Sequence, residues 1–213
     1  MYDIITSTST ISQTLLAFIS IFLFRKQPRE LKVLSIFLIT ACLIEWAGFF
    51  MSKYGIHNLS LYNILTLLEY LVTAYLLFKW AGGYMHRFLI IISVIGFTAV
   101  WIYTSIYVVP FVQYNNYVRM LQSFLTLAFA GWLLLDVSDF TKKSMLYDAR
   151  FWLGTSWVLY FAVSVVIFVL SGWLISKSGP SFYIAWVVKS FANIAGNILY
   201  GIAIICSSQK QKL

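Results

Sequence analysis

Seven long apolar stretches joined by short connectors constrain this chain more than any other feature of its sequence. Each stretch has the roughly 20 residues that a helix needs to cross the hydrocarbon core of a bilayer. The stretches are expected at about residues 4–24, 33–52, 59–79, 88–108, 115–135, 151–175 and 181–206. The sequence therefore predicts an all-α polytopic membrane protein in which residues 1–213 form a single seven-helix transmembrane domain.

The composition excludes a soluble fold. Hydrophobic residues make up 61% of the 213 residues and charged residues 10%, against roughly 45–50% and 25% in soluble domains. The connectors are far shorter than the roughly 50 residues of a small folded domain, so none can hold a kinase or a cyclase. Any output of this chain is expected to need a partner protein or a second copy of the chain.

The basic residues predict the orientation of the chain in the membrane. Eleven lysines and arginines fall on alternate connectors and the C-terminal tail, whereas the other set of connectors carries only Lys53 and Lys177. By the positive-inside rule, we expect the N-terminus outside and the C-terminus in the cytoplasm. We expect the membrane to be the bacterial cytoplasmic (inner) membrane. The net charge of +8 is thus explained by topology and contact with lipid headgroups, and we expect no nucleic-acid partner.

Four ionisable residues lie inside the expected spans: Glu45, Glu69, Arg119 and Lys189. Each costs roughly 2.5–3.5 kcal/mol at the centre of a bilayer unless it is paired or hydrated. Counting about 1.5 Å per residue places all four in the outer half, between roughly 6 and 15 Å deep. We therefore predict that Glu69 and Lys189 lie in direct contact or are joined by one water.

Helical spacing gathers polar side chains on the faces that carry these charges, which predicts polar stripes directed into the bundle. The longest stripe of the fifth span contains Asn115, Arg119, Gln122, Ser123 and Thr126. The candidate ligand-binding residues are Glu45, Tyr62, Glu69, Arg119, Trp186, Lys189, Asn193 and Asn197. The alternative is a static network that fixes helix packing, with Asn193 and Asn197 joining helices and Trp186 filling space.

The residues expected of an enzyme or a metal site are missing. The two histidines, His57 and His86, fall in connectors on opposite sides, so we predict neither a metal site nor a catalytic histidine. A two-carboxylate mechanism using Glu45 and Glu69 stays open, although two nearby bases favour the ionised form of both acids. The sequence favours a protein without enzymatic activity.

A lysine in the seventh of seven helices resembles the microbial rhodopsins. That resemblance implies retinal on Lys189 with Glu69 facing it as the counterion. It is carried by Lys189, by Glu69-Tyr70-Leu71-Val72-Thr73, and by Arg150, Trp157 and Tyr160. The departures are Ala185, Thr66 and Phe161, where the family has an acid, an arginine and a proline. We therefore expect no retinal, and the sequence names no other cofactor.

The chain also resembles, over nearly its whole length, a loose group of uncharacterised seven-helix bacterial membrane proteins. The motifs are Tyr62-Asn63 with Glu69, Arg150-Phe151-Trp152 with Tyr160-Phe161, and Asn193 with Asn197. This resemblance implies no assigned activity beyond a suspected role in signalling, and it supports the fold and orientation more than the function. Prolines occur only in connectors, at 28, 110 and 180, so no span has the broken helix of many transporters. We expect a sensor that binds a small ligand in an outward-facing charged cavity, and the alternative is a secondary transporter or channel.

Overall fold

The computed structural model describes residues 2–113, 115–140, 145–170 and 180–209, and they form seven long helices. All seven are long and apolar enough to span a membrane, which confirms the all-α fold and the integral membrane class. The helices are α1 (Tyr2–Leu23), α2 (Arg29–Lys53), α3 (Leu59–Trp80), α4 (Tyr84–Tyr103), α5 (Asn116–Phe140), α6 (Ala149–Val169) and α8 (Pro180–Gln209).

Several helices extend beyond their apolar stretches. Helix α2 begins at Arg29, four residues before the stretch that predicts it, and its first turn contains Glu30 and Lys32. Charged side chains at the membrane surface reach the headgroups, so a helix need not end where its apolar stretch ends. The last part of the expected sixth span, 171–175, lies outside the described residues.

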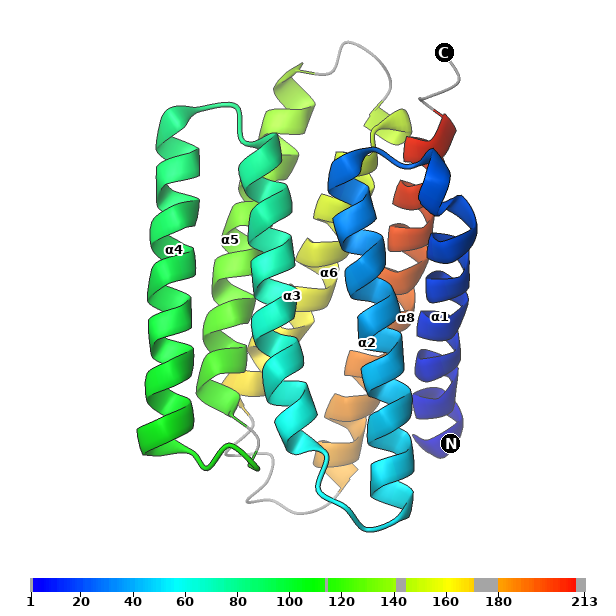
Figure 1. The fold of residues 1–213 in the computed structure, drawn as a ribbon, viewed down its shortest axis with the longest axis vertical. Coiled ribbons are helices and arrows are strands. Elements are labelled where there is room, and N and C mark those ends of the chain that lie inside the picture. Colours follow the sequence, from blue (N-terminus) through cyan, green and yellow to red (C-terminus); the bar gives the residue numbers. More distant parts are fainter. Residues whose placement is uncertain (1, 114, 141–144, 171–179, 210–213) are drawn as a thin grey trace.

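Helix α1 begins at one end of the bundle and α8 ends at the opposite end (Figure 1). We call the end that carries the N-terminus the N-side and the opposite end the C-side. The connectors 24–28, 81–83 and 145–148 lie at the C-side, whereas 54–58 and 109–113 lie at the N-side. These described connectors alternate between the two ends as the sequence predicts, and the orientation itself stays a prediction.

Six of the seven helices close into a ring. Going round it, α1 packs on α2, α2 on α3, α3 on α5, α5 on α6, α6 on α8, and α8 on α1. In Figure 1, α6 and α8 lie behind α3 and α2. Helix α4 stays outside this ring, against α3 and α5, where it buries only Ile90 and Phe97. Because α4 lies outside the ring, α3 and α5 pack directly against each other and run in the same direction.

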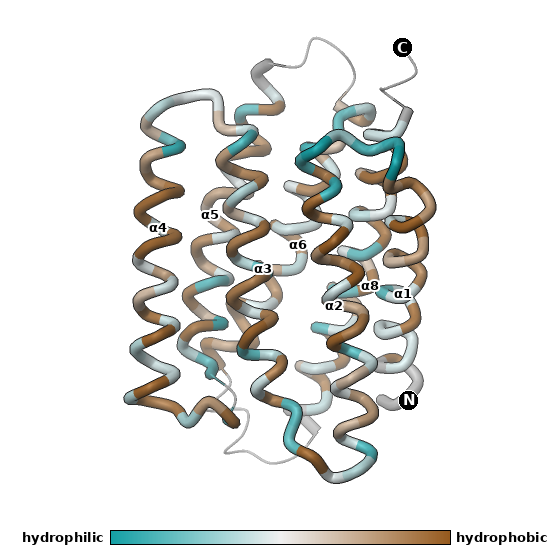
Figure 2. Tube along the Cα trace, in the orientation of Figure 1, coloured by the Kyte–Doolittle hydropathy of each residue, from teal (hydrophilic) through white to brown (hydrophobic). Residues whose placement is uncertain are grey.

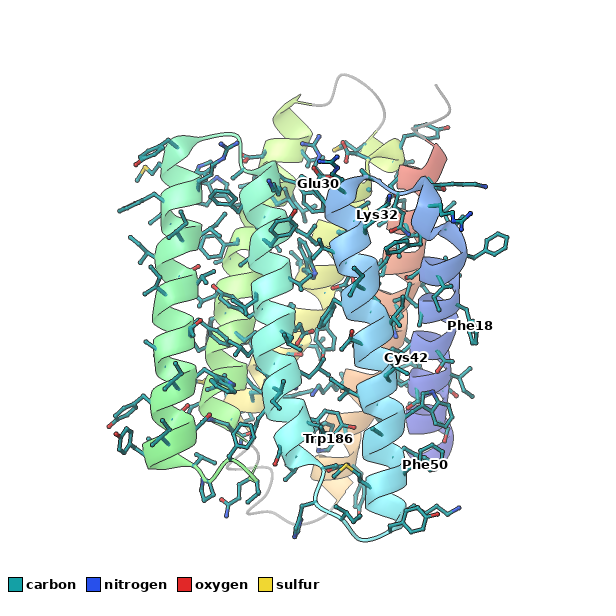
Figure 3. All side chains as sticks on the ribbon, in the orientation of Figure 1. Phe18, Glu30, Lys32, Cys42, Phe50 and Trp186 are labelled. Carbon is teal, nitrogen blue, oxygen red and sulfur yellow. The ribbon has the colours of Figure 1, made fainter. Side chains whose placement is uncertain are left out.

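The interior of the ring is divided into an apolar half and a polar half. The main cluster of buried apolar side chains belongs to the C-side half and includes Leu31, Leu76, Leu153 and Ile204. Hydrophilic positions instead interrupt the N-side half of α5 (Figure 2). Apolar side chains such as Phe18 and Phe50 project away from the bundle, as expected of a surface that contacts lipid (Figure 3).

Candidate functional site

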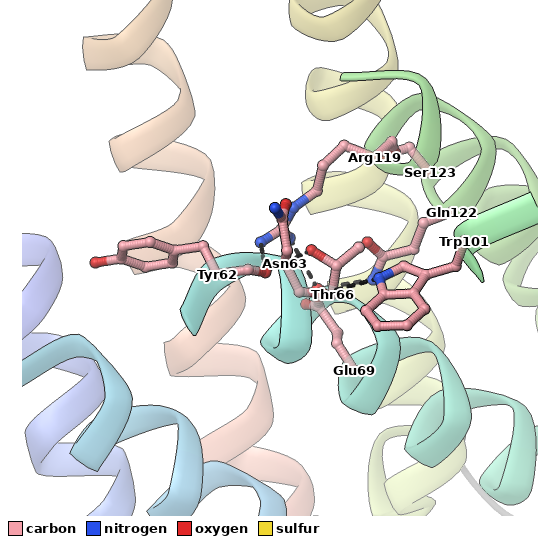
Figure 4. A network of polar contacts seen from close by, with 8 residues as sticks. All are labelled: Tyr62, Asn63, Thr66, Glu69, Trp101, Arg119, Gln122 and Ser123. Carbon is pink, nitrogen blue, oxygen red and sulfur yellow. Dashed lines mark hydrogen bonds and ion pairs between the residues drawn. The ribbon is translucent and has the colours of Figure 1, made fainter. Parts of the chain in front are cut away.

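An ion pair between Glu69 and Arg119 is the centre of the polar half (Figure 4). The Arg119 Nη1 atom lies 3.3 Å from Glu69 Oε2, and the Gln122 side-chain amide donates to the same oxygen at 2.7 Å. The two charged side chains keep only 11% and 18% of their surface exposed. Because α3 and α5 are neighbours in the ring, Arg119 reaches the carboxylate from the first turn of its helix.

The first turn of α3 connects this ion pair to the N-side surface. The Tyr62 carbonyl accepts a hydrogen bond from Arg119 Nη2 at 3.1 Å. The next residue, Asn63, donates from its side-chain amide to the backbone carbonyls of Phe111 and Gln113, both at 2.9 Å. The backbone carbonyl of Asn63 accepts a hydrogen bond from Trp101 Nε1 at 3.1 Å. Asn63 thus holds the connector after α4 against the start of α3.

Glu45 of α2 has a neutral partner. The Tyr62 hydroxyl donates to Glu45 Oε2 at 3.1 Å, and no ion pair joins Glu45 to a base within the described part of the chain. Gly48, one turn further along α2, makes this arrangement possible. A Cβ at that position would lie 2.8 Å from the Tyr62 hydroxyl oxygen, so a larger residue would displace the hydroxyl from the carboxylate.

Lys189 of α8 is held by aromatic rings. Its ammonium lies 4.6 Å from the ring centre of Phe168 and 4.7 Å from that of Trp186, close enough for cation–π attraction. Figure 3 places Trp186 in the N-side half of the bundle. Over the residues that the structure describes, Lys189 forms neither a hydrogen bond nor an ion pair.

The direct contact expected between Glu69 and Lys189 is therefore wrong. Glu69 has Arg119 as its ionic partner, and no ion pair joins Lys189 to a carboxylate among the described residues. An arrangement joined by one water stays a prediction.

The polar stripe of α5 is buried as expected. Asn115, Arg119, Gln122, Ser123 and Thr126 are each at most 9% exposed. Asn115 donates to the Thr104 hydroxyl at 2.8 Å, where α4 continues as a π-helical turn, Thr104–Val108. Such turns are frequent at functional sites.

Three buried oxygens of the interior have no hydrogen-bond partner among the described residues. They are Gln122 Oε1, Thr126 Oγ1 and, on α6, Ser164 Oγ. Buried polar atoms are nearly always paired with protein or water, so a water or another polar partner is expected beside these oxygens. Sequence reasoning did not single out Ser164, and its only signal was one hydroxyl in the apolar run 161–169.

Asn193 and Asn197 join two helices. Their side-chain amides donate to Ser9 and Ser12 of α1, at 2.8 and 2.9 Å. These bonds lie along the contact between α8 and α1, which favours the packing alternative for both asparagines. Of the eight candidate residues, the structure groups Glu45, Tyr62, Glu69 and Arg119 through direct contacts and places Lys189 on Trp186.

The fold and the site together define a seven-helix integral membrane protein with two acids and two bases in the polar half of its interior. Comparison with family models, curated proteins and solved structures found no match to this chain. Within the described ranges, no group of three histidine, cysteine, aspartate or glutamate side chains could hold a metal ion.

Proposed function

We propose that this protein is a membrane receptor that binds a small ligand between the charged side chains of the N-side interior. The observation that supports this best is the division of the bundle, with an apolar C-side core and charged residues of α2, α3, α5 and α8 in the other half. Apolar side chains fill the C-side half of this bundle, whereas the N-side half offers charged and polar groups to a ligand. A site of this kind can take a ligand from one side of the membrane.

A purely structural role does not account for all four charges. A static network holds its charges in pairs, since an unpaired charge inside a membrane protein is expensive. Arg119 and Glu69 fit that description, but Lys189 contacts two aromatic rings and forms no ion pair within the described residues. A lysine in this position is better explained by a ligand than by helix packing.

The direction of sensing follows from the predicted orientation. If the basic C-side faces the cytoplasm, the polar half opens to the outside and the ligand comes from there. The short C-side connectors hold no signalling domain, so the signal passes to a partner protein or a second copy of the chain. The resemblance to uncharacterised seven-helix bacterial proteins agrees with a signalling role.

A secondary transporter is the second candidate, and the order of the helices in the ring favours it. Helices α1–α3 and the set α5, α6 and α8 each follow one another round the ring, and α4 connects the two sets from outside. The parallel pairs α3/α5 and α1/α8 are the two junctions between these sets. This arrangement resembles parallel repeats related by an axis along the membrane normal, which occur in transporters.

A ligand screen on purified protein in lipid nanodiscs tests the binding site. Amino acids, small carboxylates and small amines are scored by the increase that each produces in the Tm of the wild-type protein. We expect at least one compound to stabilise the wild type and the Glu30→Gln control, which changes an acid at the C-side end of α2. Its affinity falls at least about tenfold in Glu69→Gln. A screen without any Glu69-dependent compound contradicts the proposal.

Flux measurements then separate the two candidates. The stabilising compound is radiolabelled and its uptake is followed in liposomes that contain only this protein. A receptor leaves the compound outside, whereas a transporter moves it, and Glu69→Gln reduces the movement. Glu69-dependent uptake by the protein alone overturns the receptor assignment and selects the transporter.

A further inference from the structure

We propose that the ligand is a small zwitterion whose carboxylate binds Lys189 and whose ammonium group binds Glu45 and Tyr62. This inference deepens the proposed function and rests on it, because it assigns a ligand class to the same interior site. It follows from Glu45 and Lys189, the two interior charges that do not take part in the ion pair between Glu69 and Arg119.

The interior charges form two unequal sets. Glu69 and Arg119 satisfy each other, with Gln122 as a further donor to the carboxylate. Glu45 and Lys189 remain, and neither has an ion-pair partner among the described residues. They are opposite in sign and lie on α2 and α8, each eight or nine residues from the N-side end of its helix and therefore at a similar level of the bundle. The site is therefore neutral as a whole but has a positive and a negative pole.

The Lys189 pole is suited to a carboxylate. The faces of Phe168 and Trp186 attract the ammonium, yet they accept none of its three N–H donors in a charge-assisted hydrogen bond. The two rings fix the position of the nitrogen and remove water from that side of it. A carboxylate that approaches from the polar interior gains the ion pair that the protein itself does not supply.

The Glu45 pole is suited to a primary ammonium group. Glu45 Oε2 already accepts from the Tyr62 hydroxyl, and over the described residues no hydrogen bond uses Oε1. The Tyr62 oxygen can also accept, so an ammonium group finds two acceptors side by side. Gly48 leaves the space that keeps the hydroxyl on the carboxylate. Three residues thus prepare an acceptor pair on α2 and α3.

Ligands with a single charge suit this site less well. An anion satisfies Lys189 but leaves Glu45 without an ionic partner, and it makes the buried site negative. A cation does the reverse. A zwitterion pairs both poles and adds no net charge to a region shielded from water, where an unpaired charge is most costly.

The test uses the ω-amino acids from glycine to 6-aminohexanoate, which carry the same two charges at increasing separation. Each is compared with its N-acetyl form, which keeps the carboxylate, and its amide, which keeps the ammonium. Affinities are measured by calorimetry on the wild-type protein in nanodiscs. We expect one or two members of the series to bind at least about tenfold more tightly than both of their singly charged forms.

Variants at the two poles should change the preference in opposite directions. Lys189→Met removes the preference for the zwitterion over the amide, whereas Glu45→Gln removes the preference for the zwitterion over the N-acetyl form. Lys189→Arg keeps the charge and most of the affinity, and it shows that the fold tolerates a change at this position. Lys53→Met, at the exposed N-side end of α2, is the matched control and keeps wild-type affinities.

The results separate failure of this inference from failure of the proposed function. Tighter binding of the N-acetyl forms or the amides, or no binding by any zwitterion of the series, overturns the inference. Equal loss of all three ligand forms in both pole variants overturns it as well, because that pattern indicates general disruption. A Glu69-dependent ligand of another class in the broader screen leaves the proposed function in place.

Discussion

The ion pair between Glu69 and Arg119 should be the strongest polar coupling in the bundle, and a double-mutant cycle measures it. Breaking a buried ion pair by removing one partner costs about 3–5 kcal/mol. These side chains keep 11% and 18% of their surface exposed, so we expect about 2–3 kcal/mol for Arg119→Met. Glu69→Gln should cost less, because its amide can still accept from Gln122.

The coupling free energy is the difference between the loss of stability in the double variant and the sum of the losses in the two single variants. Contacts between neutral polar groups of transmembrane helices average about 0.6 kcal/mol in such cycles. An ion pair with 3.3 Å between nitrogen and oxygen in a shielded interior should exceed that value, and we expect about 1–2 kcal/mol. The free energy of unfolding is measured by titration with a denaturing detergent in mixed micelles.

A second cycle checks the choice of partner. Glu69→Gln and Lys189→Met should show a smaller coupling free energy than the Glu69/Arg119 pair, because no direct ion pair joins them among the described residues. If the Glu69/Lys189 cycle shows the larger coupling, the pairing argued from the structure is wrong. Additivity in the Glu69/Arg119 cycle would refute the reasoning equally.

Three further predictions follow from the same contacts and from the charge distribution. Gly48→Ala should cost about 1–3 kcal/mol of unfolding free energy, since the added Cβ lies 2.8 Å from the Tyr62 hydroxyl. Gly131→Ala is the control: its added Cβ meets no side chain or other helix within 4 Å, so wild-type stability or better is expected. Asn63→Ala should accelerate amide hydrogen exchange over 111–113 and leave exchange in the C-side core unchanged, because two bonds to that connector are lost; equal acceleration in both regions would contradict the assignment. A periplasm-active phosphatase fused to the C-terminus should be inactive, and an active fusion would reverse the predicted orientation.

Much of the architecture could be predicted from the sequence because the bilayer imposes a simple rule. Each apolar stretch had to become a helix, and seven helices were found. The stripe of α5 was equally predictable, since Thr126 and Gln122 recur at helical spacing and both are almost completely buried. Periodicity identifies which face of a helix is buried without any knowledge of its neighbours.

The contacts of Asn63 were not predictable in the same way. Its side chain bonds to backbone carbonyls about 50 positions further along the chain, and the sequence around 111–113 carries no pattern that indicates an acceptor. A backbone carbonyl has the same chemistry at every position. Only the path of the connector after α4 brings those oxygens to the start of α3.

The ionic partner of Glu69 depends on which helices are neighbours, and the depth of each charge in the membrane does not give this. Counting residues from the helix ends places four charges at similar levels, but a partner also requires neighbouring helices with facing stripes. Here α4 leaves the ring, so that α3 meets α5 directly and Arg119 reaches Glu69 before Lys189 can. The segment 88–108 of the α4 region contains no acidic, basic or histidine residue. This agrees with the position of α4 outside the ring, because a helix without charged side chains can face lipid at little cost. Among the described residues Lys189 of α8 then forms no ion pair with a carboxylate, nor does Glu45 of α2 with a base, and from these two charges the site acquires its two poles.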